Sequence, residues 1–432
     1  MRVYDPLYGV IKLSKLEYSI ISSPEIQRLR YVRMCNINSL LVTGASEISR
    51  FEHIIGVLHL AHIWVENNGN SLKQDEKEEI YAAALLHDFQ TGPFGHSLQY
   101  VFEDNDSAEI FIHDDIVHGA YQKFHQSTDA NASFTGRPFC STELLGNKWD
   151  AVATLIKGEG KHGPLISGTV DIDNIDNVIR LAYHVGIATT DDAKVAIELA
   201  QDLIPTSNGL EISGEKILLL EKWQQIRRRL YELLLLDWAE FSAKAMLTRA
   251  MELAVEHDLL GADSWLKTDL ELLDYLGLSR GESQEIPQLA KRIKCGDLYT
   301  PICLTTSNFT DLYLKFSNIT SKKNIEDRLS EKVRDTLKLN LKLLIHPILD
   351  NRKTDRSVDV VIRETKEKRR IGTDSKQLLI GVFISKELSS SDKLENLRRL
   401  ILSFLVEEGM TDISYIKDPM IEPKDFQMEL LC

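Results

Sequence analysis

The chain has 432 residues, of which 43% are hydrophobic, so it can form a large core and lies outside the disordered class. Its formal net charge of −14 argues against a dedicated non-specific nucleic-acid binder, although a local basic pocket for a phosphorylated small molecule is compatible with it. The five cysteines form no CxxC pair, no apolar run could span a bilayer, and the N-terminus lacks an apolar leader. We therefore expect a cytoplasmic protein without a disulfide framework or a membrane anchor.

Helix signals dominate residues 1–262, which we interpret as a helical catalytic domain. Ser23-Pro24 is typical of a helix start and opens the segment 26–35. Apolar residues at helical spacing predict further helices over 51–65, 76–86 and 173–185, and one or two long helices over 216–257. Only short hairpins, near residues 10–13 and 210–212, are expected to interrupt this pattern.

After residue 262 the sequence becomes mixed, and residues 263–432 are predicted to form a smaller α+β part. Helices are expected over 269–278, 286–293 and 394–408. The strand candidates, rich in β-branched residues, are 297–305, 358–363 and 378–384. The fold class predicted for the chain is mainly α, with this C-terminal α+β part packed on the helical domain.

Three segments of the helical part carry the side chains that hold a hard divalent metal. His53 ends the motif Arg50-Phe51-Glu52-His53, His87-Asp88 closes a second helix, and Asp173 begins a third. A metal that activates water needs a few histidine nitrogens and carboxylate oxygens, with coordination positions left open. The sequence offers His53, His87, Asp88 and Asp173 as candidate ligands of one divalent metal, and two histidines with two carboxylates suit Mg, Mn, Fe or Zn alike.

The helix over 173–185 is informative by itself. At 100° per residue, one face carries the polar residues Asp173, Asp176, Asn177, Arg180 and His184, and the opposite face is apolar. A plain amphipathic surface helix would show the same pattern, and Asp176 could support the metal site or carry only a surface charge. Asp171 falls on the other side of this helix.

Two more histidines lie on the same predicted helix as His53. His59 and His62 lie well round the first helix from His53, so neither is predicted to be a ligand.

In this order, RFEH, ALLHDxxxGPFGH and DIDNIDNVIR resemble the HD superfamily, and more narrowly the dGTPase and dNTP triphosphohydrolase family that includes the SAM-and-HD-domain proteins. The opening DPLYGVIKL…SPEIQRLRYVR and the later DLELLDYL…LAKRIKCGDLY are also typical of that family. The resemblance implies the HD-domain helical fold. It also implies hydrolysis of a deoxynucleoside triphosphate at the α-phosphorus, giving deoxynucleoside and tripolyphosphate.

The resemblance also assigns roles to residues of this chain. It implies that the four predicted ligands match the family's metal ligands, that Arg50 contacts substrate phosphate, and that His96 and His113 are catalytic histidines. It further implies that Arg227, or Arg228 beside it, binds phosphate. A guanidinium suits phosphate because its planar fork pairs with two oxygens.

Several positions depart from the family pattern. Thr91 stands where an active-site histidine is usual, Gln99 replaces an acid beside His96, and Asn177 occupies the place of a sugar-contacting tyrosine. The Tyr-Gln pair expected downstream of Arg227 is replaced by leucines over 234–236. These changes leave the metal ligands intact and put the identity of the substrate in doubt.

Two rival functions therefore stay open. One is an HD-type phosphodiesterase or phosphatase acting on another nucleotide. The other is a nucleotide-sensing or single-stranded nucleic-acid-binding protein with little turnover, which the acidic charge does not favour. Gln27 and Arg30 match positions that bind an activating nucleotide at a subunit interface in regulated relatives, so a homo-oligomer with an allosteric nucleotide is also an expectation.

Overall fold

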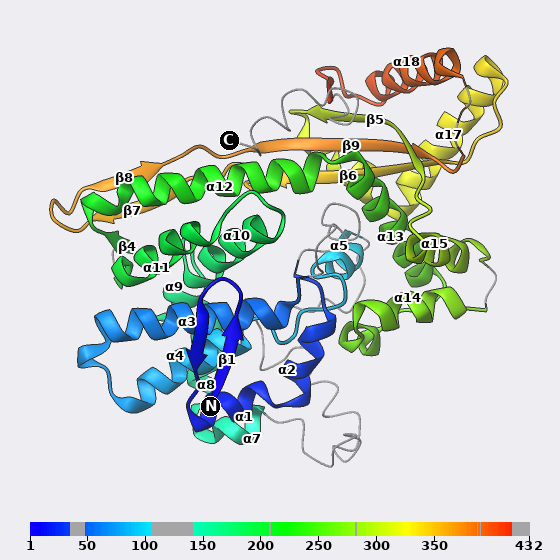
Figure 1. Ribbon diagram of the computed structural model, residues 1–432. Coiled ribbons are helices and arrows are strands. Elements are labelled where there is room, and N and C mark those ends of the chain that lie inside the picture. Colours follow the sequence, from blue (N-terminus) through cyan, green and yellow to red (C-terminus); the bar gives the residue numbers. More distant parts are fainter. Residues whose placement is uncertain are drawn as a thin grey trace.

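The computed structural model describes residues 1–34, 48–104, 141–206, 209–280, 283–386, 388 and 390–416, and all structural statements below concern these ranges. Its first part is built mainly of helices (Figure 1). They are α1 (Lys15–Ile21), α2 (Pro24–Arg28), α3 (Arg50–Asn68), α4 (Gln74–Leu86), α5 (Ser97–Asp104), α7 (Ser141–Leu145), α8 (Trp149–Ile156), α9 (Gly163–Ile166), α10 (Ile172–His184), α11 (Ala193–Asp202), α12 (Ile217–Leu236) and α13 (Trp238–Glu256).

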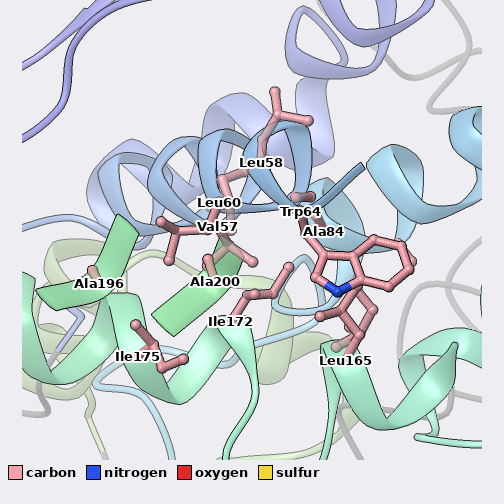
Figure 2. Close-up of a cluster of buried hydrophobic side chains, with 14 of the residues drawn as sticks. Val57, Leu58, Leu60, Trp64, Ala84, Leu165, Ile172, Ile175, Ala196 and Ala200 are labelled. Atoms are coloured by element: carbon pink, nitrogen blue, oxygen red, sulfur yellow. The ribbon is translucent and has the colours of Figure 1, made fainter. Parts of the chain in front are cut away.

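The helix α3 is the centre of this part, with α4, α10 and α11 packed around it. It begins where the Ser49 hydroxyl accepts a hydrogen bond from the Glu52 amide, which satisfies one of the free N–H groups of the first turn. Figure 2 shows Val57, Leu60 and Trp64 of α3 meeting apolar side chains of α9, α10 and α11. This packing fixes the helices that carry the predicted metal ligands.

Two sequence expectations for the helices need correction. The segment 26–35 is not one helix, because α2 ends at Arg28, a 3₁₀ turn follows over Leu29–Tyr31, and Arg33 pairs with Ser49 in an isolated β-bridge. The stretch 216–257 forms two helices, α12 and α13, separated at Asp237, whose carboxylate caps α13.

Short hairpins occur near the two places where they were expected. At the N-terminus β1 (Arg2–Asp5) pairs with β2 (Gly9–Lys12), and later β3 (Ile204–Thr206) pairs with β4 (Gly209–Ile212). The second hairpin extends into the C-terminal region, because β4 pairs in parallel with β7 (Val358–Ile362), which in turn pairs with β8 (Lys368–Ile371). One sheet therefore joins residues from both sides of position 262.

A second sheet, in the order β10-β5-β9-β6, forms the C-terminal core. Its strands are β5 (Thr300–Ser307), β6 (Leu343–Asn351), β9 (Lys376–Ile384) and β10 (Ser414–Ile416), and every pairing is antiparallel. The remaining helices are α14 (Asp269–Leu278), α15 (Glu285–Lys294), α16 (Tyr313–Ser317), α17 (Ile319–Leu337) and α18 (Ser391–Glu407).

Alternate residues of this sheet face two different helical layers, as the pleat of a strand requires. Leu344 and Phe383 pack in the same buried cluster as residues of α13, whereas Ile345 and Val382 pack with residues of α17 and α18. Figure 1 shows α17 and α18 outside the sheet and α12 running along the side toward α10. The inner layer places β6 next to the helical part, where it contributes to the site described below.

No helix of the described ranges is both long and apolar enough to cross a membrane.

Candidate metal centre and its cavity

The predicted metal ligands meet at the junction of α3, α4 and α10. His53 lies on α3, His87 and Asp88 follow the last residue of α4, and Asp173 is in the first turn of α10. His53 Nε2 lies 2.8 Å from Asp173 Oδ1 and 3.3 Å from His87 Nε2. Asp88 Oδ2 lies 3.7 Å from His87 Nε2 and 3.8 Å from His53 Nε2.

These separations fit a bound divalent cation. Adjacent ligands of an octahedral ion with bonds of ~2.1 Å lie ~3.0 Å apart, close to the spacing of the donor atoms here. His53, His87 and Asp88 are all buried and their ligand atoms lie within 4.8 Å of one another, so they could hold a metal ion. Asp173 keeps 30% of its side chain exposed, so it borders solvent-accessible space where further ligands can enter.

The two histidines are each oriented by a second contact. His53 Nδ1 lies 2.7 Å from Asp176 Oδ2, and Arg180 donates to both oxygens of Asp176, at 2.9 and 3.0 Å. His87 Nδ1 lies 2.9 Å from the Ala84 carbonyl oxygen, which leaves Nε2 for a ligand. Such partners fix the tautomer and the direction of a ligating histidine. Asp176, which the sequence left open between two roles, is therefore a supporting carboxylate and not a surface charge.

The middle of the polar face of α10, at Asp176 and Arg180, is buried, contrary to what a plain surface helix would show. Arg180 and Asp176 are both 0% exposed, and the Arg180 guanidinium also contacts Glu52 at 2.8 Å and Asp5 at 2.9 Å. Gly56 of α3 makes room for this pair, because a Cβ there would lie 2.1 Å from Arg180 Nη2 and 2.2 Å from Asp176 Oδ1. Sequence reasoning missed Gly56, which differs from an ordinary helix glycine only through this long-range contact.

Asp88 accepts hydrogen bonds from Arg50 and Thr91, which hold its carboxylate toward the cluster. Arg50 Nη1 donates to its Oδ2 at 2.6 Å, and the hydroxyl of Thr91 donates to its Oδ1 at 2.9 Å. Arg28 secures the same segment from α2 by donating to the carbonyl oxygens of Phe89, at 3.1 Å, and Thr91, at 2.6 Å. The hydroxyl of Thr91 is thus engaged with Asp88, one of the predicted metal ligands.

The carboxylates of the cluster favour the protonated, positively charged form of its two histidines. Burial lowers the pKa of His87, but the charges of Asp173 and Asp88 outweigh it and raise this pKa to about 10. Burial likewise opposes protonation of His53, yet its hydrogen bonds to Asp173 and Asp176 raise its pKa. Asp173 behaves in the opposite way, because His87 and His53 lower its pKa against the effect of burial. A divalent cation would compete with these protons for the same oxygens and nitrogens.

Asp171 does not join the cluster. It is the N-cap of α10, and its carboxylate accepts hydrogen bonds from the amides of Asn174 and Gly168, both at 2.6 Å. Burial, followed by the charge of Asp173, raises the pKa of Asp171 to about 7. His59 and His62 are also directed elsewhere, since His59 stacks near Tyr8 and His62 lies 2.9 Å from Glu17 Oε1.

His96 is positioned by an unusual turn. Phe94 and Gly95 both have positive φ, +56° and +64°, a conformation that is costly for phenylalanine. Asp269 of α14 stabilises this turn by accepting a hydrogen bond from the Phe94 amide at 2.7 Å. Nδ1 of His96 lies 3.2 Å from the Gln99 side-chain oxygen, which carries no charge. Asp269 had not been identified from the sequence.

A cavity of about 630 Å³ opens beside the cluster. From the helical part it is lined by Arg50, Asp88, His96, Asp173 and Asn177. A second group of lining residues comes from α12, α13, β6 and the turn after β6, and includes Tyr231, Lys244, His346 and Lys353. Oδ1 of Asn177 is buried and has no hydrogen-bond partner among the described residues, so it is an available acceptor at this surface.

Not every residue selected from the sequence reaches this cavity. Arg227 donates to the backbone carbonyl oxygens of Thr354 and Arg352, both at 3.1 Å, and Arg228 is 60% exposed and paired with Glu232. Both line a separate, smaller depression instead. The structure therefore does not bring them to the predicted metal site.

The remaining predicted residues are a catalytic histidine, His113, and the pair Gln27 and Arg30. His113 lies outside the described residues. Gln27 and Arg30 contact each other at 2.8 Å, with Arg30 exposed above the ring of Phe51.

The comparisons with known proteins agree with this geometry. Residues 50–132 match the family model of the HD domain. The chain is 26% identical, over 46% of its length, to the deoxynucleoside triphosphate triphosphohydrolase SAMHD1 of Xenopus laevis. It is 23% identical, over 68% of its length, to the SAMHD1 homolog of Dictyostelium discoideum. These matches span 37% and 57% of the two relatives, so the chain covers less than two thirds of either.

The fold has a counterpart among solved structures. A crystal structure of a phosphohydrolase from Bacteroides thetaiotaomicron superposes with a TM-score of 0.63 and 17% identity, over 88% of this chain and 99% of the other. At that identity the likeness concerns the fold alone. The sequence matches add the motif in which His53, His87 and Asp88 lie: the chain carries an HD domain over residues 50–132 and is similar in sequence to deoxynucleoside triphosphate triphosphohydrolases.

Proposed function

We propose that this protein is a metal-dependent phosphohydrolase that hydrolyses deoxynucleoside triphosphates to deoxynucleoside and tripolyphosphate. The observation that carries the proposal is the arrangement of one cavity. Arg50, Asp88, His96 and Asp173 come from three separate segments and line the same space of about 630 Å³, and His53 and His87 lie directly behind the two carboxylates. The names of the relatives supply the substrate class.

His53, His87, Asp88 and Asp173 would hold the metal. A divalent ion bound there would polarise a phosphoryl oxygen and lower the pKa of a bound water. The residues themselves supply fixed geometry, because the partners Asp176, Ala84 and Thr91 hold the ligands in one orientation. Arg50, which already donates to Asp88, lines the cavity and places a permanent positive charge beside the substrate phosphates.

His96 is the proposed proton donor to the leaving oxygen. Its turn is fixed by Asp269, so the imidazole is held at the cavity before substrate binds. The neutral side chain of Gln99 orients the ring but stabilises its protonated form less than a carboxylate would. Asn177 completes the proposed substrate contacts, since its buried Oδ1 can accept a hydrogen bond from a hydroxyl of the sugar.

The test is a product analysis with purified protein, Mn²⁺ or Mg²⁺, and each dNTP alone and in mixtures. We expect deoxynucleoside and tripolyphosphate in equal amounts, and their loss when the metal is removed by a chelator. The variant His87→Gln should be inactive, whereas Asp191→Asn, which changes a carboxylate with an 85% exposed side chain, should match the wild type. Absence of turnover with every dNTP and every mixture would refute the proposal.

The mixtures also test the regulatory part of the proposal. Activation at Gln27 and Arg30 in a homo-oligomer requires that one dNTP accelerate hydrolysis of another. Hydrolysis of each dNTP at the same rate alone and in mixtures would count against this regulation and leave the hydrolase intact.

A second function is favoured by the residues around His96. Thr91 and Gln99 remove an imidazole and a carboxylate from the positions where the family resemblance expects them, and Thr91 is occupied with Asp88. A phosphatase or phosphodiesterase acting on another nucleotide needs the same metal cluster with different leaving-group chemistry. Release of orthophosphate, or opening of a cyclic nucleotide, in the same product analysis would identify that activity.

A further inference from the structure

The turn between β6 and β7, residues 352–357, reaches the metal centre from the C-terminal region. Arg356 donates to the side-chain oxygen of Asn174 at 3.1 Å and to the Gly168 carbonyl oxygen at 3.3 Å. Asn174 directly follows Asp173, so the turn is joined to the first turn of α10 beside the metal cluster. A segment far from the HD motifs in sequence is therefore part of the same site.

The turn is held rigidly. The Asp350 carboxylate accepts hydrogen bonds from the amides of Lys353, at 2.9 Å, and Thr354, at 3.0 Å. Arg227 of α12 donates to the carbonyl oxygens of Arg352 and Thr354, on either side of Lys353. A rigid turn of this kind can present a side chain to a ligand at a low entropic cost. Arg227 therefore helps to hold the turn in place.

Lys353 is the residue that this turn presents to the cavity. It is half-buried, lines the same space as Arg50, Asp88 and His96, and its ammonium lies 5.0 Å from the centre of the Tyr100 ring. The Tyr100 amide donates to the carbonyl oxygen of His96, so Lys353 is near the turn that carries His96. Within the described ranges it forms no ion pair with a carboxylate, whereas Lys322 on the same cavity is paired with Glu252.

We propose that Lys353 binds the phosphate chain of the substrate and forms, with Arg50, a two-sided anion subsite next to the metal cluster. The proposal rests on the proposed phosphohydrolase function. A half-buried ammonium without a carboxylate partner is most stable beside an anion, and the proposed function puts the phosphates in the cavity that Lys353 lines. The C-terminal region would then select for phosphate-chain length.

The experiment compares Lys353→Met, Lys353→Arg and the control Lys376→Met, which alters an exposed lysine on β9 that does not line the cavity. Kinetics are measured with the best deoxynucleoside triphosphate, and binding of inorganic tripolyphosphate to the metal-loaded protein is measured by calorimetry. For Lys353→Met we expect KM for the triphosphate and Kd for tripolyphosphate to rise about tenfold or more, with kcat changed less than about threefold, because the contact stabilises ground state and transition state alike.

Two further results are expected if the subsite is real. Lys353→Arg should recover most of the affinity, and the penalty of Lys353→Met in competition assays should decrease from the nucleoside triphosphate to the monophosphate. A penalty that is the same for both, or a Lys353→Met variant that matches Lys376→Met, would overturn the subsite.

These outcomes are separable from failure of the proposed function. A wild type that hydrolyses dNTPs while Lys353→Met shows normal KM and Kd refutes only the subsite. A wild type that binds tripolyphosphate through Lys353 but hydrolyses nothing supports the subsite and refutes the hydrolase. If the metal-loaded wild type does not bind tripolyphosphate, the subsite is refuted whatever the activity.

Discussion

The cavity has two walls that are built in different ways. On the metal wall, formed by His53, His87, Asp88 and Asp173, each of the first three side chains also contacts a fixed partner behind it. The C-terminal wall is formed by residues of α12, α13, β6 and the turn at Lys353. It includes the charged side chain of Lys353, which has no carboxylate partner in the described ranges, although its backbone is held rigidly.

Under the proposed function, this difference assigns catalysis to the metal wall and substrate selection to the C-terminal wall. Buried partners hold the ligand side chains in one coordination geometry. This suits a metal that does the same chemistry whichever substrate is bound. Side chains that gain a partner only when a ligand enters are suited to binding it. Changes on the metal wall should therefore lower kcat, and changes on the C-terminal wall should raise KM.

The largest expected effect comes from the metal wall. Asp88→Asn keeps the shape of the side chain and removes the charge that Arg50 and Thr91 orient toward the cluster. We expect metal content to fall well below one ion per chain and kcat to fall by roughly a thousandfold or more. Metal analysis and steady-state kinetics test this. A variant with full metal content and a changed KM alone would break the division between the two walls.

The second prediction concerns Asp176, which contacts the predicted ligand His53. Asp176→Asn weakens the orientation of His53, and such changes behind a ligand typically lower metal affinity by about 10- to 100-fold. Glu52→Gln is the matched control, because Glu52 contacts the same Arg180 but not His53. Metal titration of both variants should show a large shift for Asp176→Asn only. Equal shifts would mean that Arg180, and not the histidine contact, governs affinity.

The third prediction concerns stability. Gly56→Ala places a methyl group 2.1 Å from Arg180 Nη2, so the buried ion pair must shift, and we expect a loss of about 1–3 kcal/mol in the free energy of unfolding. Gly277→Ala in α14 is the control, since its Cβ would meet nothing closer than 3.8 Å and alanine favours a helix. In chemical unfolding, the free energy of unfolding should be highest for Gly277→Ala, intermediate for the wild type and lowest for Gly56→Ala.

The metal wall could be predicted from the sequence because its geometry is local. RFEH and HD are short motifs at helix ends, and the periodicity of α10 places Asp173 and Asp176 on one face while Asp171 is set apart as the N-cap. The burial of Asp176 and Arg180 could not be predicted, because it depends on Gly56 in another helix.

The C-terminal wall was not predictable in the same way. The strand β6 contains Pro347, which argues against a central strand, and the sheet tolerates it because β6 is at the edge of the order β10-β5-β9-β6. The helix α17 is highly charged, and Ile325, Leu329 and Val333, spaced four residues apart, are enough to pack it on the sheet. Without β6 in place, nothing in the sequence directs Lys353 to the metal site.

The smallest expected effect tests a histidine on the far side of α3 from the metal. Burial, followed by the charge of His62, lowers the pKa of His59 from 6.5 to about 4, whereas the carboxylates around His53 raise the pKa of that residue. Between pH 6.5 and 4 the unfolded chain binds a proton at His59 that the folded chain does not, so stability must fall as the pH falls through this window.

Replacing His59 by phenylalanine, which can still stack on Tyr8, removes this proton linkage. The loss of stability between pH 7.5 and pH 5 should then shrink by roughly 1 kcal/mol, because partial exposure of His59 reduces the full linkage value. Urea unfolding at both pH values measures it, with the exposed His257→Phe as control. An unchanged pH dependence in His59→Phe would mean that His59 contributes no proton linkage in this window, and that the two faces of α3 do not differ as their contacts indicate.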